Sequence, residues 1–182
     1  MADPPPPIHS SGAGVLYSQE FYQAVKAHLN PGGVMMMWIP YDQTVDEFRA
    51  HVQTFHSVFP HDILAFGPGK FGVFMLGSDA PLAFDPAAMA SILNRPGVIR
   101  DLAGAPDSPK TPMDATAWTS FIQGQIWLQG DQVVKFAADA PLITDDRPYT
   151  EYYLVRKVLT HFFGPHSLRM TEPNLRAATP AG

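Results

Sequence analysis

An uninterrupted apolar run from Val34 to Ile39, bounded by Gly33 and Pro40, constrains the fold more than any other part of this chain. A run in which apolar and polar residues do not alternate is typical of a strand that is covered on both faces. Strands with one wet face show alternation instead. We therefore expect residues 34–39 to form a central strand of a sheet with helices on either side.

Helical patterns flank this strand. Ser18 is a candidate N-cap for a helix over residues 18–29, and the sequence Asn30-Pro31-Gly32-Gly33 supplies stop signals. After the strand, Thr44 and Glu47 have the spacing of a capping box. Apolar residues then recur at steps of three and four as far as Pro60, which predicts a second amphipathic helix; they are Val45, Phe48, Val52, Phe55 and Phe59.

Two further apolar stretches, residues 61–66 and 71–76, are separated by the short turn Gly67-Pro68-Gly69-Lys70. A turn of this length favours an antiparallel hairpin. The order helix, strand, helix, strand, strand is that of the final part of an α/β sheet that ends in an antiparallel hairpin. We therefore assign the chain to the α/β class and place this unit in residues 1–78.

Residues 79–182 form a proline-rich extension in this interpretation. Short helices are expected at 86–94 and 115–123, and little regular structure fits between them. Residues 132–136 fit either a strand or a helical turn. A closing helix is expected at about 149–162, because acidic residues and Pro148 precede an apolar pattern. The tail from Pro165 onward is expected to be mobile.

Composition excludes several classes of function. Hydrophobic residues make up 46% of the 182 residues and charged residues 16%, which is enough apolar material for a packed core. The formal net charge is -5 and the basic residues are scattered, so neither nucleic acid nor an anionic membrane is an expected partner. No apolar run approaches the roughly 20 residues of a membrane-spanning helix. The absence of cysteine permits a reducing compartment, and we expect the cytoplasm.

Few residues have the pattern of a chemical site. Residues 67–72 match the letters G-x-G-x-x-G, but they join the two strands of the expected hairpin and open no helix, so no nucleotide-binding turn is expected there. His51, His56 and His61 are spaced by five, which does not place two imidazoles on one helix face, so no metal site is expected. Asp3 precedes a run of four prolines that reads as the end of a strand leading into a helix, where α/β sheets bind ligands. Its carboxylate is our candidate for accepting a proton or holding a cation. Asp145 and Asp146 fit either a helix start or an anionic pair facing a polycation.

Three N-terminal blocks together resemble the second half of spermidine synthase-like proteins. They are Asp3-Pro4-Pro5-Pro6-Pro7, Leu16-Tyr17-Ser18-Gln19-Glu20-Phe21-Tyr22 and Pro31-Gly32-Gly33-Val34. A fourth block, residues 141–152, resembles a segment near the end of the bacterial, often membrane-fused branch. The resemblance implies a methyltransferase-type Rossmann fold, a polyamine substrate and transfer of an aminopropyl group from decarboxylated S-adenosylmethionine to an amine such as putrescine. Family members are often dimeric, so a homo-oligomer is compatible with it.

The chain also departs from the family pattern. Spermidine synthases carry a second aspartate where this chain has Pro6, and a proline cannot accept a proton. The family's donor-binding turn lies upstream of Asp3, so we expect no cofactor to be bound by this chain alone and cannot assign cofactor-binding residues. Two interpretations follow: part of an aminopropyltransferase with Asp3 as its catalytic residue, or an inactive relative that serves as a protein-interaction or structural module.

Overall fold

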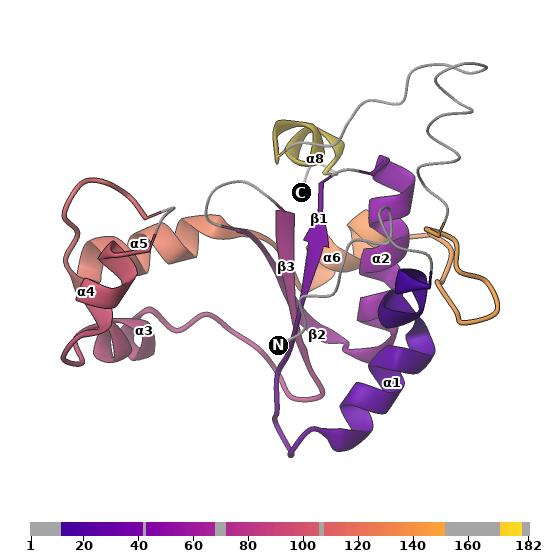
Figure 1. Ribbon diagram of the computed structural model, residues 1–182, viewed down its shortest axis with the longest axis horizontal. Helices are drawn as coiled ribbons and strands as arrows, with labels where there is room; N and C mark the ends of the chain where they lie inside the picture. Colours follow the sequence, from indigo (N-terminus) through magenta and orange to yellow (C-terminus); the bar gives the residue numbers. More distant parts are fainter. Residues whose placement is uncertain (1–11, 42, 68–71, 106–107, 152–171, 180–182) are drawn as a thin grey trace.

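A four-stranded sheet lies at the centre of the molecule (Figure 1). The computed structural model describes residues 12–41, 43–67, 72–105, 108–151 and 172–179. The strands lie in the order β1-β3-β2-β4, and their bounds are β1 (Met35–Pro40), β2 (His61–Phe66), β3 (Gly72–Ser78) and β4 (Ile126–Gln129). Because β3 is antiparallel to both β1 and β2, these two strands run parallel to each other on either side of it. The predicted α/β class and antiparallel hairpin are confirmed.

One face of the sheet is closed by the helices α1 (Gln19–His28) and α2 (Val45–Val58). Every second residue of β1 points to this side and is buried, with Met37 and Ile39 fully inaccessible. Both predicted caps form. The Ser18 hydroxyl accepts a hydrogen bond from the N–H of Phe21, and Thr44 makes the expected capping box with Glu47. We call this side the closed face.

Aromatic rings fill the closed face. Tyr22 of α1 and Phe55 of α2 meet edge to face with ring centroids 5.1 Å apart, and Phe59 lies 5.0 Å from Phe55. All three side chains are fully buried. Opposite them β3 carries Gly77, where a Cβ atom would lie 2.5 Å from the ring of Phe55. The helices can approach the sheet this closely because the strand has no side chain at that point.

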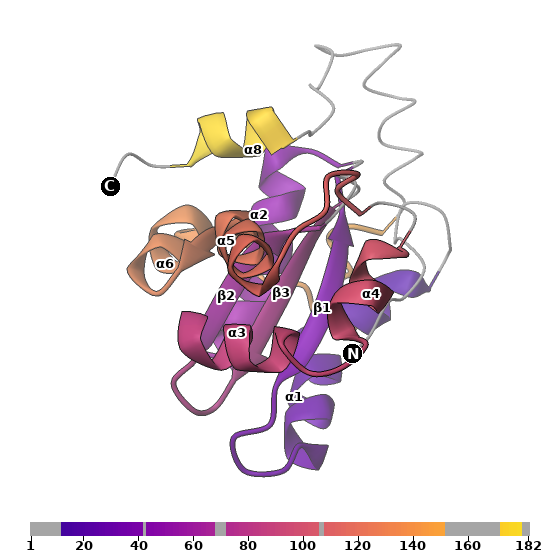
Figure 2. The same cartoon turned by 90° about the vertical axis from the view of Figure 1, so that its left-hand side faces the viewer.

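The other face is covered less completely, and we call it the open face. Its side chains are only half buried; they include Met36, Trp38, Phe74 and Leu76. Three helices, α3 (Pro86–Leu93), α4 (Val98–Ala103) and α5 (Ala115–Gln125), stand in front of it (Figure 2). They pack on one another around a small core of their own, centred on Leu93 and Trp118. We call these three helices the arm.

Two expectations about this region need correction. Within the described sheet β1 is an end strand rather than a central one, since its hydrogen-bonded partner is β3 alone. The apolar side chains on the other face of β1, such as Met36, face the arm. The arm also contains α4, which the sequence did not predict, because six residues are too few to show a helical period. Its start is marked by Gly97, whose φ of 89° is the left-handed conformation that glycine favours.

The segment after the arm returns to the sheet. β4 was not predicted; it pairs antiparallel with β2, and its Leu128 is fully buried. The ambiguous stretch after it is the helix α6 (Asp131–Ala137), and Arg49 of α2 donates hydrogen bonds to the carbonyl groups of Phe136 and Ala138 at its end. Those bonds fix the end of α6 against α2. The boundary at residue 78 stays a prediction, although β4 joins the sheet from beyond it.

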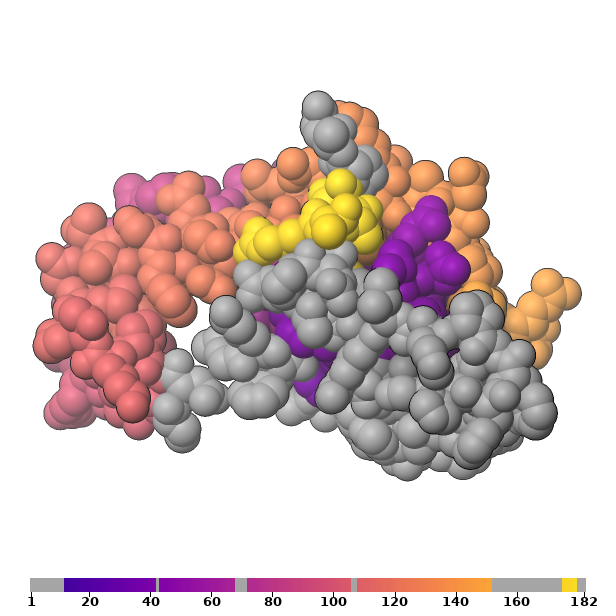
Figure 3. All heavy atoms as spheres, turned by 90° about the horizontal axis from the view of Figure 1, so that it is seen from above, coloured from indigo at the N-terminus to yellow at the C-terminus, as the bar shows by residue number. Residues whose placement is uncertain are grey.

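The tail was expected to be mobile, and this prediction is wrong for residues 172–179. They contain the helix α8 (Glu172–Ala178), in which Leu175 is fully buried and the Arg176 guanidinium lies 4.3 Å from the ring centroid of Phe66. Thr179 accepts a hydrogen bond from the indole of Trp127 at 2.9 Å. In the space-filling view α8 lies beside the residues that follow the arm (Figure 3). The predicted helix at about 149–162 lies mostly outside the described residues.

Candidate functional site

Two parts of the chain that are distant in sequence meet beside α1. The segment 141–151 lies against the 3₁₀ helix η1 (Ala13–Tyr17) and the start of α1. Gly12 donates its N–H to the Glu151 carboxylate at 2.8 Å, and Gln19 donates its N–H to the carbonyl of Ile143 at 2.9 Å. The structure therefore joins two of the sequence blocks on which the family resemblance depends.

A buried threonine holds the 141–151 segment to α2. The hydroxyl of Thr54 accepts a hydrogen bond from the N–H of Ile143 at 2.9 Å and donates one to the carbonyl of Ala50 at 2.7 Å. Thr54 and Ile143 are fully inaccessible. Because a buried backbone N–H without a partner is costly, this single hydroxyl fixes where the segment enters the closed face.

The 141–151 segment surrounds a hollow of about 790 Å³. Its charged and polar lining residues are Thr144, Asp146, Arg147, Tyr149 and Glu151. The Thr144 hydroxyl donates to Asp146 at 2.7 Å, and this hydrogen bond is the main cause that lowers the pKa of the Asp146 carboxyl. The lowered pKa favours the ionised form of Asp146, and the hollow holds the carboxyl groups of Asp146 and Glu151 together with the guanidinium of Arg147.

The two aspartates of this segment were open to two interpretations. Asp145 and Asp146 are both exposed, and they occupy a turn closed by an isolated bridge between Thr144 and Arg147. The N–H of Asp145 donates to the Glu20 carboxylate of α1 at 3.1 Å. The helix that they were expected to start lies outside the described residues, so the capping interpretation stays a prediction.

A second group of polar residues lies at the carboxyl end of β1, where α/β sheets bind ligands. Gln43 is buried and donates its amide to the carbonyl of Pro40 at 2.8 Å. Glu47 is also buried, and both the N–H and the hydroxyl of Thr44 donate to its carboxylate at 3.0 Å. These groups make the turn from β1 into α2 rigid, so in the described residues they support the edge of the sheet.

The histidines of the α2 region have separate surroundings. His51 is fully buried with its ring 4.9 Å from that of Tyr17, and burial lowers its pKa to about 3. His56 lies 3.2 Å from the buried carboxylate of Asp62, and this hydrogen bond raises its pKa. His61 is exposed at the start of β2. Among the described residues, no group of three or more histidine, aspartate or glutamate side chains could hold a metal ion.

Asp3, the predicted catalytic residue, lies outside the described residues, as does most of the Gly67-Pro68-Gly69-Lys70 turn. Sequence analysis did not single out Glu151 or Thr54, which the structure places at the junction beside α1. Glu151 belongs to the quoted block at 141–152, so that block was the available signal. Thr54 lies outside the predicted apolar stripe of its helix, so the sequence carried no signal for its burial.

The chain is thus a mixed α/β protein in which parallel strands flank an antiparallel one, with a hollow lined by carboxylates beside the first helix. Its fold is similar to a solved structure described as a probable spermidine synthase from Corynebacterium glutamicum ATCC 13032, with a TM-score of 0.44 and 18% sequence identity. The match covers 71% of this chain and 41% of that one, so this chain spans less than half of that protein's length. No protein-family model matches the sequence. In the described part of the chain, no helix is long and apolar enough to cross a membrane.

Proposed function

We propose that this chain is part of a spermidine synthase-like aminopropyltransferase that acts in polyamine biosynthesis. The observation that supports this function best is the junction beside α1, where two blocks of the family resemblance pack against each other around a hollow lined by Asp146 and Glu151. A polyamine such as putrescine is a dication at neutral pH, because its amines have pKa values near that of lysine, about 10.4. Carboxylates at this place suit such a substrate.

The chemistry assigns one role to each side of the substrate. The attacking amine must lose a proton before its nitrogen forms a bond to the propyl carbon of decarboxylated S-adenosylmethionine. The bond from that carbon to the sulfonium sulfur breaks, and the electron pair stays on sulfur as a neutral thioether. In this proposal the Asp3 carboxylate orients the attacking amine and accepts its proton, and Asp146 and Glu151 attract the distal ammonium group.

The donor is not expected to be held by this chain alone. The one G-x-G-x-x-G match in the sequence, residues 67–72, joins the antiparallel strands β2 and β3 and opens no helix, so the proposal requires donor-binding residues from a further polypeptide segment or subunit. We expect the purified chain to bind neither decarboxylated S-adenosylmethionine nor putrescine with micromolar affinity. The active species is proposed to be cytoplasmic.

The second candidate function is a non-enzymatic interaction or structural module. Pro6 favours it, because the position where spermidine synthases carry a second aspartate has no group that can take a proton. The free outer edge of β1 within the described sheet also favours it, since an unpaired strand edge is a template for another chain.

The test is to isolate the native protein from its own cells by affinity purification and to assay it with decarboxylated S-adenosylmethionine and putrescine. Mass spectrometry should detect spermidine and methylthioadenosine in equal amounts. Asp3→Ala should lower the rate by roughly 10²-fold or more, as expected for loss of a group that activates the nucleophile. The matched control Asp79→Ala, at an exposed bend, should leave the rate unchanged. Absence of both products from the native protein would favour the module, and unchanged turnover by Asp3→Ala would remove the catalytic role.

A further inference from the structure

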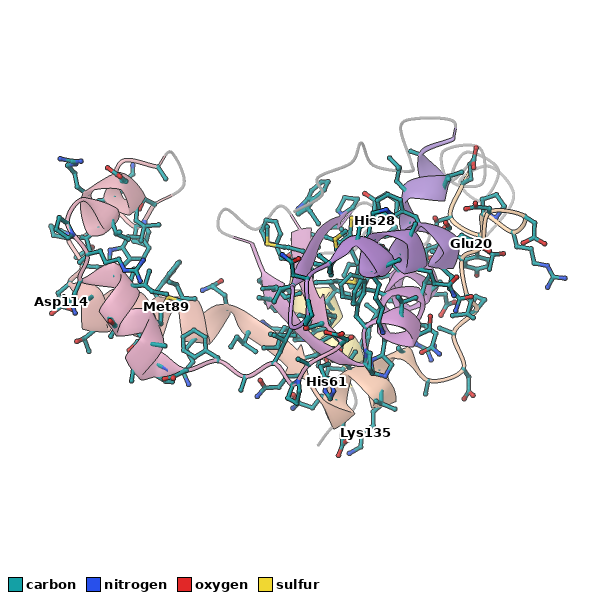
Figure 4. The ribbon with its side chains drawn as sticks, turned by 90° about the horizontal axis from the view of Figure 1, so that it is seen from below. Glu20, His28, His61, Met89, Asp114 and Lys135 are labelled. Atoms are coloured by element: carbon teal, nitrogen blue, oxygen red, sulfur yellow. The ribbon has the colours of Figure 1, made fainter. Side chains whose placement is uncertain are left out.

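An apolar cavity of about 540 Å³ lies between the open face of the sheet and the arm. The sheet contributes the side chains that alternate with the closed-face residues, among them Met36, Ala65 and Phe74. The arm contributes Met89 of α3 and Trp118 of α5, both of which belong to its small core. In Figure 4, Met89 lies on the side of the arm nearer the sheet, whereas Asp114 lies on the far side. The cavity thus has two facing walls rather than one flat surface.

The lining is suited to an uncharged ligand. None of the described residues that line the cavity carries a charge. Placing a charged group there would leave it desolvated without an opposite charge, which is strongly unfavourable. The volume lies within the range of roughly 300–1,000 Å³ that is typical of small-molecule sites. A polyamine, which is a dication at neutral pH, is therefore not expected in this cavity.

One hydrogen-bond donor in the lining has no partner. Trp118 is 5% exposed, and its indole nitrogen makes no hydrogen bond in the described structure. The other polar side chains of the lining are already bonded: Ser108 donates to the carbonyl of Leu102 at 2.7 Å, and Gln125 donates to that of Phe121 at 3.2 Å. A buried donor without an acceptor is unfavourable. A ligand with an acceptor near Trp118 would remove that penalty.

We propose that the cavity between sheet and arm binds an uncharged, largely apolar small molecule that carries one hydrogen-bond acceptor, such as a ketone or an ester. The proposal is independent of aminopropyl transfer, because it uses other residues on the opposite side of the sheet. A second copy of the chain is a poorer occupant. A stable protein interface needs about 800 Å² from each partner, whereas this site is a slot between two walls.

The probe is 6-propionyl-2-(dimethylamino)naphthalene, an uncharged naphthalene with one ketone whose fluorescence shifts to shorter wavelength in apolar surroundings. The chain should give a saturable shift with a dissociation constant on the order of 100 µM, from about 0.3 kcal/mol for each non-hydrogen atom. The non-fluorescent ketone 2-undecanone should displace the probe. Putrescine should not displace it.

Three variants locate the site. Ala65→Trp places a large ring in the cavity and should abolish the saturable shift, whereas the matched control Ala24→Trp, on the exposed side of α1, should bind as the wild type does. Trp118→Phe keeps an aromatic ring and removes the N–H, so binding should weaken about fivefold, the equivalent of one hydrogen bond. Circular dichroism melting shows whether each variant is folded, and Trp118→Phe keeps the test decisive if Ala65→Trp does not fold.

Three results would overturn the proposal. The first is a wild-type chain without a saturable shift, and the second is equal binding by Ala65→Trp and Ala24→Trp when both are folded. The third is a shift that follows the formation of a dimer in sedimentation velocity as the protein concentration rises, because the occupant would then be a second copy. Failure of the spermidine assay leaves these outcomes unchanged, so the two proposals fail separately.

Discussion

The two faces of the sheet are built from the same strands but are covered in different ways. On the closed face, strand side chains such as Met37 and Met75 are fully buried beneath α1 and α2. On the open face, neighbouring residues of the same strands, such as Met36 and Phe74, are only half buried and line a cavity beneath the arm. Alternation along a strand therefore divides one apolar sequence between a packed core and a hollow.

The closed face is therefore suited to stabilising the fold, and the open face to binding a ligand. Close packing of aromatic rings against a strand supplies much of the free energy of folding. Adding or removing an atom on that face therefore lowers the free energy of unfolding. A half-covered face tolerates such changes better and leaves room for a ligand. The following predictions test that contrast in order of decreasing effect on stability.

The largest effect is expected for Phe55→Ala on the closed face. The variant removes a fully buried ring that contacts Tyr22 and Phe59, so the free energy of unfolding should fall by about 3–5 kcal/mol. The matched variant Phe74→Ala on the open face should lower it by about half as much, since that ring is only half buried. Urea unfolding followed by circular dichroism measures both. Equal losses would show that the two faces are packed alike.

A smaller loss is expected when one methyl group is added to the closed face. In Gly77→Ala the new Cβ would lie 2.5 Å from Phe55 and 2.6 Å from Phe59, so α2 must move away from β3. Overpacking of this kind lowers the free energy of unfolding by about 1–3 kcal/mol. The same urea titration measures it. A neutral substitution would mean that α2 is held loosely against the sheet.

The closed face should also respond to acid through His51. Burial lowers its pKa from 6.5 to about 3, so the unfolded chain binds a proton at this residue at pH values where the folded chain does not. The free energy of unfolding should therefore fall as the pH drops from 6.5 toward 3. His51→Leu should reduce this acid loss and change stability at pH 7.5 by less than about 1.5 kcal/mol, since neither ring nitrogen has a hydrogen-bond partner in the described structure.

Urea midpoints at pH 7.5 and pH 5 provide the measurement for this prediction. The matched control is Gln23→Leu, at an exposed position of α1, which removes no titratable group and should leave the pH dependence unchanged. The opposing contribution of His56 is retained in both variants. Its raised pKa adds stability that is fully present below pH 6.5 and is lost as the pH rises through the higher folded value. If His51→Leu loses as much stability between pH 7.5 and pH 5 as the wild type does, another residue is responsible for the loss.

The smallest effect is expected in the arm. Gly124 lies in α5, and a Cβ atom there would meet nothing within 4 Å, so Gly124→Ala should stabilise that helix by about 0.5–1 kcal/mol. Differential scanning calorimetry should show a single transition shifted to higher temperature if arm and sheet unfold together. A shift confined to one of two transitions would show that the arm unfolds by itself, so the cover of the open face would be less stable than that of the closed face.

The sequence was a good guide to the closed face and a poor one to the open face. Caps at Ser18 and Thr44 and the apolar spacing of α2 are local signals, so the bounds of both helices could be predicted within a few residues. β4 and α8 carry no comparable signal, because four and seven residues acquire their structure from what they pack against. The tail was judged from its polarity, although one buried leucine, Leu175, fixes it to the core.

The candidate site was predicted only in part. The blocks that contain Glu20 and Asp145 could be recognised in the sequence, but their contact could not, since it depends on a hydrogen bond between residues 125 positions apart. The cavity beneath the arm had no sequence signal either. Its lining residues are ordinary apolar side chains that would equally well fill a packed core.

By itself the sequence determined which segments are helices and strands around the hairpin, because hydrophobic period, caps and turns act between residues near each other in the chain. Only the tertiary structure decided that β1 ends the described sheet, that α1 and α2 close one face, and that the arm stands away from the other. Those outcomes depend on which apolar surfaces pack together. The hydrophobic effect is non-directional, so it stabilises the burial of any apolar surface and does not select the partner.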